Sequence, residues 1–351
     1  MTEPLPQKLA TAFQQQRSAC EQLGSPFTAR ICQTIAENGL PPSSVREMIA
    51  TWPGDPSSNG DSVPLRLCGA LHELVLSGAD AHLAELYPPA TDVLELSHIH
   101  SALAGAISRH EGRICKRLLN PPQTNEIGRA AAIHAGLLHI VTLIDKPLIL
   151  SEIGASAGLN LLLDRFGFTL GETVSGAENS PVHLQPEWTG KAPPPADFMI
   201  ADRRGCDLSP FDLAEENHRI RLLSYLWADQ TDRLDRMRSA LAIFDELPVK
   251  VDAADAVDWL DQRLSSTRPG HAHVVFHTIA WQYLSKGDQR RGKRIIQAAG
   301  ARSTRDAPLF LLSMESDGRS PGAALRICAW PGGNVRELAR VDFHARWIAW
   351  I

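Results

Sequence analysis

The feature that most limits the fold of this chain is the segment at residues 147–166. A short apolar run, a turn of small residues and a second apolar pattern follow one another there, in the order PLILSEI, GASAG and LNLLLDRF. The first run has the length and character of a buried strand, and the last has the spacing of a helix. Glycine and small residues between them allow a tight connection. We therefore predict a strand, a tight turn and a helix at this point.

Residues that precede this segment carry helical patterns only. Apolar residues recur at helical spacing over 6–38, where Gly24, Ser25 and Pro26 interrupt them, so two helices are expected. A loop rich in Pro, Gly, Ser and Asp at 53–63 separates these helices from further helical patterns at 64–78, 94–118 and 128–142. The sequence therefore predicts an all-helical N-terminal domain over residues 1–145.

Residues that follow the segment alternate between apolar runs and helical sequence. Three further runs, at 248–251, 273–276 and 309–312, predict parallel strands joined by crossover helices. The last two runs, at 325–330 and 346–350, predict an antiparallel pair at the C-terminal edge of the sheet. The second domain is thus expected to be an α/β domain spanning 146–351.

Composition and charge exclude several classes of partner. The formal net charge is -5, from 35 basic and 40 acidic residues, which argues against a duplex nucleic acid partner. The first ten residues lack the pattern of an export signal, and no apolar run is long enough to cross a membrane. Six cysteines stand singly, and the histidines lack metal-ligand spacing. We expect a cytoplasmic protein without a membrane, metal or duplex nucleic acid partner.

The turn after the first strand also resembles a cofactor-binding motif. Glu152, Gly154 and Gly158 match the acid and glycines in the first motif of the Rossmann-like S-adenosylmethionine-dependent methyltransferases, and Ser156 replaces the middle glycine. The resemblance implies a Rossmann-like, mostly parallel sheet and assigns these residues, with Ala155, to the cofactor site. The alternative is a close-packed turn that binds no ligand.

Two later acids extend the same resemblance. Asp207, in GCDLSP, matches the acid that accepts the ribose hydroxyls, although a helix cap or Asx turn explains it equally well. Asp252 and Ala253, after the run at 248–251, match the pair that faces the adenine amine. Because Asp207 lies further from Gly158 than in that family, we expect an insertion at about 167–196 that forms a hairpin and a lid or substrate wall.

Other polar residues are candidates for catalysis and substrate binding. His277 directly follows the run at 273–276 and is the candidate general base, since histidine titrates near neutrality; a buried structural histidine is the alternative. Candidate substrate contacts are polar or aromatic residues near the turn or the end of this run, namely Gln123, Asn125, Glu126, Arg129, Asn160, Trp281 and Tyr283. Thr124 or Asn125 can also cap the helix that follows.

A hydrolase is the main competing hypothesis. The letters GASAG also fit the nucleophile elbow of α/β-hydrolases, with Ser156 as nucleophile and Asp252 or Glu315, then His344, as later partners. Such enzymes have strands before the elbow, whereas the sequence here is helical. The methyltransferase hypothesis is therefore preferred.

Several phrases of the chain, including QTNEIGR, RRGCDLSP, FHTIAWQYL and HARWIAW, resemble an uncharacterised bacterial family catalogued as domain of unknown function 2332. Relatives often have His-Gly before the last strand, where this chain has His344 and Ala345. The resemblance implies no reaction. The hypotheses are an S-adenosylmethionine-dependent methyltransferase with a small-molecule acceptor, a non-catalytic nucleotide- or metabolite-binding protein, and the serine hydrolase.

Overall fold

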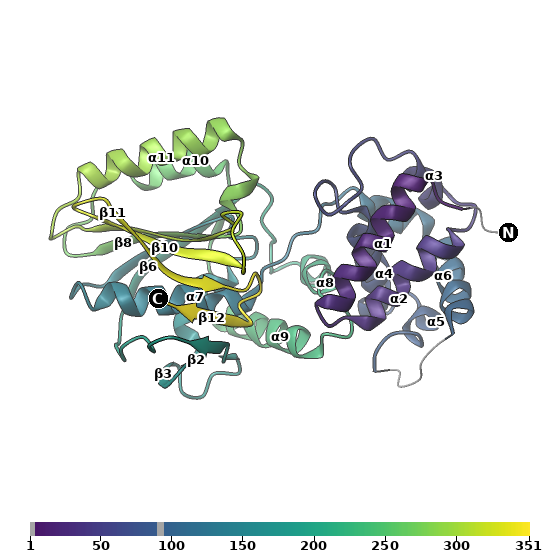
Figure 1. Cartoon of the computed structure of the whole chain (residues 1–351), viewed down its shortest axis with the longest axis horizontal. Helices are drawn as coiled ribbons and strands as arrows, with labels where there is room; N and C mark the ends of the chain where they lie inside the picture. The colour runs from purple at the N-terminus through teal and green to yellow at the C-terminus, as the bar shows by residue number, and fades with distance from the viewer. Residues whose placement is uncertain (1–3, 90–94) are drawn as a thin grey trace. The chain divides into compact units, whose positions relative to one another are not determined.

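The structure is a computed structural model that describes residues 4–89 and 95–351. The chain forms two compact units, one from residues 1–124 and 212–235 and the other from 125–211 and 236–351 (Figure 1). This division differs from the expected boundary at residue 145. Residues 125–145 belong to the second unit because helix α7 (Ala130–Val141) packs on its sheet, and 212–235 join the first because α8 (Glu216–Ser224) packs on α4 (Val63–Leu76).

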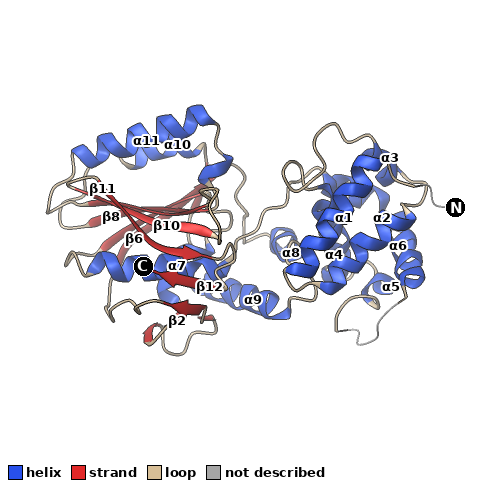
Figure 2. Cartoon of the chain, in the orientation of Figure 1, coloured by secondary structure: helices blue, strands red, loops and turns tan. Residues whose placement is uncertain are grey.

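The first unit is helical throughout the residues that the structure describes (Figure 2). Its expected break at 24–26 is confirmed, because Gly24 has a φ of +79° and Pro26 occupies the first turn of the next helix. Phe13, Ile35 and Leu71 are among its fully buried side chains. Besides α4 and α8, its helices are α1 (Gln7–Gln22), α2 (Pro26–Asn38), α3 (Ser44–Ala50), α5 (Ala81–Ala84) and α6 (Leu96–Leu118). Among the helices of the described residues, none has the length and apolarity needed to cross a bilayer.

The second unit is built on a nine-stranded, mostly parallel sheet with strand order β5-β12-β11-β10-β9-β8-β1-β6-β7. Neighbouring strands are parallel along the series β9-β8-β1-β6-β7. They are antiparallel along the series β9-β10-β11-β12. The bounds are β1 (Leu148–Ile153), β5 (Glu187–Thr189), β6 (Ile200–Asp207), β7 (Val251–Ala253), β8 (Ala272–Thr278), β9 (Leu309–Glu315), β10 (Ala323–Trp330), β11 (Asn334–Val341) and β12 (Trp347–Trp350).

Helices cover both faces of this sheet. Helices α10 (Ala256–Arg263) and α11 (Lys286–Ala301) lie on one face and α7 on the other (Figure 1). The expected runs at 248–251, 273–276 and 309–312 contribute to β7, β8 and β9. Helix α9 (Thr231–Glu246) precedes β7. The predicted α/β architecture with a helical N-terminal region is confirmed.

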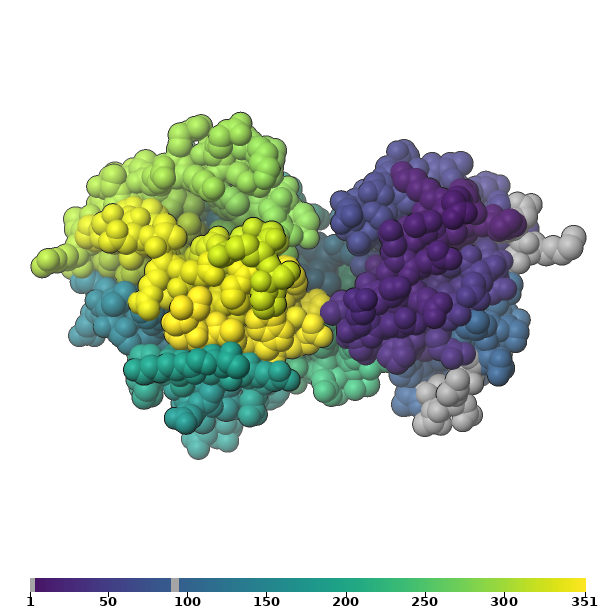
Figure 3. All heavy atoms as spheres, viewed as in Figure 1, coloured from purple at the N-terminus to yellow at the C-terminus, as the bar shows by residue number. Residues whose placement is uncertain are grey.

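The predicted antiparallel pair at the C-terminus is wrong, because a third strand lies between its two members. Residues 334–341 include several charged and polar residues, yet they form β11, which pairs with both β10 and β12. Its charged side chains, such as Glu337 and Arg340, enter an ion-pair network with Asp317 and Arg326. Much of the visible surface of the unit in Figure 3 comes from this C-terminal region, drawn in yellow.

Ala345, before β12, has a φ of +56°, a conformation that glycine adopts most readily.

The segment after β1 also departs from expectation. Residues 159–165 form a 3-10 helix, η2 (Leu159–Arg165), instead of an α-helix. The expected insertion contains a hairpin of β2 (Gly167–Leu170) and β3 (Thr173–Gly176), followed by β4 (His183–Leu184) and the edge strand β5. His134 of α7 stacks on Phe168 of β2 with ring centroids 3.9 Å apart. These contacts make the hairpin a layer on α7, and none of them supports a lid over the strand ends.

Candidate active site

The loop that follows β1 has three residues in the left-handed region. Gly154, Ser156 and Gly158 have φ values of +68°, +56° and +76°. A Cβ at Gly154 would lie 2.5 Å from the Cβ of Ala280, and one at Gly158 would lie 2.7 Å from Cγ2 of Val251. Both glycines are therefore required by conformation and by close approach. Gly154 itself is exposed, while Ala155 and Ser156 are buried.

Asp207, at the end of β6, fixes the shape of this loop. Its Oδ2 accepts a hydrogen bond from the backbone N–H of Ser156 at 3.0 Å, and its Oδ1 accepts one from Ser209 N–H at 3.0 Å. The second bond is the Asx turn that the sequence allowed. The carboxylate thus ties the end of β6 to the loop after β1.

Glu152 is buried on β1, one residue before the end of the strand. Its side chain is 2% exposed, and burial raises the pKa of this carboxyl well above its ordinary value, although a hydrogen bond to Asn160 opposes the shift. The nearby positive charge of Arg129 opposes it further. A neutral carboxyl at this position can donate as well as accept a hydrogen bond.

The segment before α7, which holds several of the predicted substrate contacts, packs against the loop and η2. Asn125 Oδ1 accepts a hydrogen bond from Leu159 N–H at 2.9 Å, and Asn160 Nδ2 donates to the Glu126 carbonyl at 3.4 Å. Glu126, and neither Thr124 nor Asn125, caps the following turn, because its Oε1 accepts from Gly128 N–H at 3.1 Å. The predicted capping residues were therefore wrong by one or two positions.

Arg129 and Gln123 lie differently from one another. Arg129 donates from Nε to the Phe343 carbonyl at 2.9 Å and from Nη1 to the Thr278 carbonyl at 3.2 Å, which places its guanidinium at the end of β8. Gln123 belongs to the first unit. Contacts within the second unit therefore hold Arg129 beside the strand ends, and Gln123 is not part of that unit.

His277, one residue before the end of β8, lies beside an acid that the methyltransferase interpretation did not use. Its Nδ1 lies 2.7 Å from Glu315 Oε1, and the same oxygen accepts from the N–H groups of Ala280 and Trp281 at 2.9 and 3.0 Å. Burial alone would raise the pKa of Glu315, but His277 and these donors hold it below its ordinary value. An ionised Glu315 fixes the proton of a neutral His277 on Nδ1, so that Nε2 is the basic atom.

The two candidate aromatic residues differ in exposure. The Trp281 ring stacks on His277 with centroids 5.1 Å apart and is buried in η3 (Trp281–Tyr283). Tyr283 is 78% exposed. Trp281 therefore shapes the surroundings of His277, and Tyr283 has the exposure of a surface side chain.

Glu152 and His277 approach the strand ends from opposite faces of the sheet. In the register of β1 and β8, Glu152 pairs with Phe276 and Ile153 pairs with His277. Since successive side chains alternate between faces, Glu152 lies on the face of Phe276 and His277 on the face of Ile153. A ligand that contacts both must therefore lie across the carboxyl ends of the strands.

Buried oxygens without partners are concentrated at this end of the sheet. Among the described residues, five buried side-chain oxygens make no hydrogen bond, and they belong to Glu152, Ser156, Asn160, Glu315 and Tyr87. The first four lie in β1, its loop, η2 and the end of β9. Because buried polar atoms are normally satisfied, this concentration indicates a place where a ligand or ordered water binds.

Asp252 and Ala253 end the edge strand β7. The Asp252 carboxylate accepts from Arg204 Nε and Nη2 at 2.5 and 2.8 Å and from Trp259 Nε1 at 2.8 Å. Ala253, which pairs with Asp207 in the register, is exposed. The acid predicted to face adenine thus already has strong partners within the unit.

The geometry does not assemble the triad of the alternative hydrolase hypothesis, Ser156 with Asp252 or Glu315 and His344. Ser156 has the positive φ that a nucleophile elbow requires, but its buried Oγ makes no hydrogen bond to any described residue. Its Oγ therefore has no bond to His344, the base of this hypothesis, and the two candidate acids are engaged elsewhere, Asp252 by Arg204 and Glu315 by His277. A nucleophile needs its base within hydrogen-bond reach.

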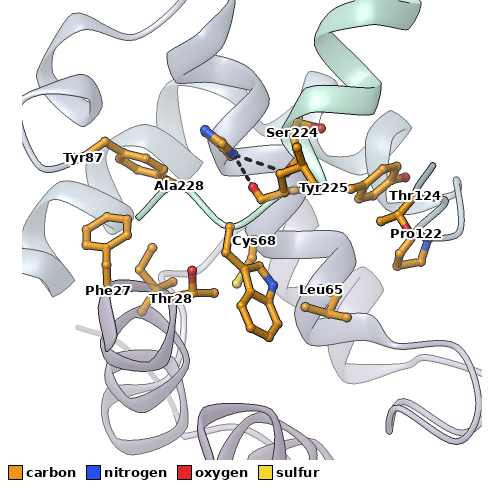
Figure 4. A pocket seen from close by; sticks show the side chains of 15 residues that line it. Phe27, Thr28, Leu65, Cys68, Tyr87, Pro122, Thr124, Ser224, Tyr225 and Ala228 are labelled. Carbon is orange, nitrogen blue, oxygen red and sulfur yellow. Dashed lines mark hydrogen bonds between the residues drawn. The ribbon is translucent and has the colours of Figure 1, made fainter. Parts of the chain in front are cut away.

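The first unit has a small cavity that the sequence did not indicate (Figure 4). Its volume is about 50 Å³, and Phe27, Cys68 and Tyr87 are among its lining residues. His72 Nδ1 lies 3.0 Å from the Leu226 carbonyl in its wall. This space is sufficient for a few water molecules, so the strand ends of the second unit are the stronger candidate site.

Comparisons with curated proteins and with solved structures gave no match. Residues 10–350 match the model of a family described as "Uncharacterized protein conserved in bacteria (DUF2332)", and the chain therefore belongs to this family.

Proposed function

We propose that the second unit binds S-adenosylmethionine across the carboxyl ends of β1 and β6 and transfers its methyl group to a small-molecule acceptor. The observation that carries the proposal is the left-handed loop 154–158 at the end of β1. Taken in chain order, the five parallel strands have the order 3-2-1-4-5 of a Rossmann-like sheet, and β1 lies where the order reverses. Ligands of such sheets bind at that point.

The unpartnered buried oxygens support this cofactor. Glu152, Asn160 and Ser156 offer acceptors at the loop, and the cofactor carries an ammonium group and two ribose hydroxyls that donate hydrogen bonds. Asp207 lies beside them at the end of β6, where ribose is held in related sheets. Asp252 and Ala253 border the adenine end in this arrangement, with the Asp252 carboxylate already engaged by Arg204.

The bound cofactor would supply an activated methyl group, so the chain mainly has to orient the acceptor and accept its proton. His277 is the proposed base, because the bond to Glu315 leaves Nε2 as the basic nitrogen. Arg129, at the end of β8, and Trp281 are the proposed neighbours of the acceptor. Asn125 and Glu126 act by holding η2 and the loop in place.

Calorimetric titration with S-adenosylmethionine and S-adenosylhomocysteine tests the proposal. We expect saturable binding of both. Asp207→Asn should weaken it by about tenfold or more, since the change removes one charge-assisted contact, and Glu152→Gln should weaken it because it replaces the buried carboxyl at the loop. Asp306→Asn is the matched control, because Asp306 is an exposed acid paired with Lys146. Absence of binding to the unaltered protein, or equal losses in the control, would refute the proposal.

The positive φ of Ser156 gives the hydrolase one favourable observation, and a direct assay separates it. We expect Ser156→Ala to leave any ester cleavage by the purified protein unchanged, because no histidine hydrogen bonds to its Oγ in the described residues. Loss of such cleavage in this variant would favour the hydrolase. Cofactor binding with no methyl transfer to any acceptor would instead indicate a non-catalytic binding protein.

A further inference from the structure

A polar cavity lies beside the edge of the sheet and shares only Asp252 with the proposed cofactor site. Strand β6 has eight residues, but β7 pairs only with its last three, Gly205, Cys206 and Asp207. A cavity of about 260 Å³ lies next to Arg204 and Asp252 of these strands. Its remaining wall comes from α10 and from residues 265–268, which follow that helix.

Two of its arginines are fixed by acids. Arg204 binds both oxygens of Asp252. Arg263, whose side chain is 11% exposed, donates from Nη2 to Asp202 Oδ2 at 2.7 Å and from Nε to Ser151 Oγ at 2.9 Å. Guanidinium groups held in this way lose little conformational entropy when they bind an additional acceptor.

A third arginine in the wall has no acid of its own. Arg268 is exposed, lines the cavity and makes no side-chain hydrogen bond or ion pair with a described residue. Ser266, in the same wall, contributes a hydroxyl that also makes no such bond. These groups are donors directed at a space that is large enough for a charged group and part of the molecule that carries it.

The local charges have a positive surplus. Four cations, Arg204, Arg263, Arg268 and Lys250, stand against two carboxylates, Asp252 and Asp202, which leaves two positive charges unmatched. The acid Asp258 of α10 pairs with Arg291 of α11 instead. A phosphate monoester carries up to two negative charges at neutral pH and has acceptor oxygens for several guanidinium donors.

We propose that this cavity binds the phosphate group of a small phosphomonoester. Arg268 and Arg263 are the proposed ligands, Arg204 supplies further positive charge, and Ser266 donates from its hydroxyl. The proposal does not depend on the cofactor site, because none of these four residues is assigned to that site, and only Asp252 of the cavity wall borders its adenine end. It assigns a second ligand to the unit, bound along the α10 face of the sheet edge.

Titration calorimetry with ribose 5-phosphate, ribose and inorganic phosphate at constant ionic strength tests it. We expect binding of ribose 5-phosphate and inorganic phosphate and none of ribose, because the charged group supplies the affinity. Arg268→Ala should weaken binding by about tenfold, the loss of one charge-assisted interaction. It should leave the unit folded, since Arg268 is exposed and its charge acts on Asp202 without a hydrogen bond or ion pair.

Matched variants complete the test. Arg305→Ala removes another exposed arginine that does not line the cavity and should leave binding unchanged. Arg263→Lys keeps the charge but loses the planar fork, and should weaken phosphate binding while the unit stays folded by circular dichroism. No phosphate binding at millimolar concentration, or equal losses for Arg268→Ala and Arg305→Ala, would overturn the proposal.

Discussion

The loop after β1 gives the sharpest test of the structure, through the substitution Gly154→Ala. Alanine at a φ of +68° costs about 1–2 kcal/mol in backbone strain. Its Cβ would also lie 2.5 Å from the Cβ of Ala280, an overlap of the kind that costs about 1–3 kcal/mol when a packed site must shift. Reduced freedom of the unfolded chain offsets about 0.4–1 kcal/mol. These contributions give a net loss of about 1–5 kcal/mol in the free energy of unfolding, with a middle value of about 3 kcal/mol, measured by urea titration with tryptophan fluorescence.

Two variants separate the strain from the overlap. Gly270 has a φ of +77° with no atom near its absent Cβ, so Gly270→Ala should cost only about 1 kcal/mol. The double variant Gly154→Ala with Ala280→Gly removes the methyl group that Gly154→Ala meets, and should recover most of the difference between the two single variants. If Gly154→Ala costs no more than Gly270→Ala, or if the double variant shows no recovery, the described approach of the loop to Ala280 is incorrect.

Three further predictions concern buried charge. Burial raises the pKa of Glu152, so the folded protein holds a proton that the unfolded chain releases above about pH 4.5. The free energy of unfolding should therefore fall as pH rises. Urea titrations of Glu152→Gln should lack this fall. Burial lowers the pKa of both His134 and His273 to about 3, so the unfolded chain binds protons at a higher pH than the folded protein does. The free energy of unfolding should therefore fall as pH drops from 6.5 towards 3. Circular dichroism should show a less steep fall in a variant with both histidines replaced by glutamine. Arg117→Met leaves Glu73 without its buried partner and should cost about 3 kcal/mol in thermal unfolding, part of which Glu73→Gln should restore. A flat pH profile in the first two cases, or an unchanged melting temperature in the third, would contradict these expectations.

Local sequence signals predicted the elements that depend on them. Gly24 and Pro26 mark the break between the two helices. Gly24 adopts a positive φ, and Pro26, which has no N–H group, lies in the first turn of the second helix, where an N–H would have no helical acceptor. The run at 148–153 is buried on every residue, as expected for a central parallel strand. Asp207 ends β6 as predicted, although only the structure shows that it holds Ser156.

The features that the sequence did not predict depend on contacts between residues far apart in the chain. Strand β11 was missed because Glu337 and Arg340 are balanced by Asp317 and Arg326, which come from other parts of the chain. The partner of His277 was missed for the same reason. Glu315 is 38 residues away in the sequence, and only the parallel pairing of β8 with β9 brings it to Nδ1.

The kinds of buried groups left unpaired at the strand ends also limit the ligand. The oxygens of Asn160 and Glu315 only accept, whereas the neutral Glu152 carboxyl and the Ser156 hydroxyl can accept as well as donate, so a partner that brings donors fits them best. The lowered pKa of Glu315 keeps a negative charge beside His277, which favours a cationic or proton-releasing ligand. An ammonium and a sulfonium on one molecule meet both conditions, whereas a neutral ester supplies neither a donor nor a positive charge. The electrostatics of this edge therefore favour the methyl-donor proposal over hydrolysis on grounds that are independent of the loop motif.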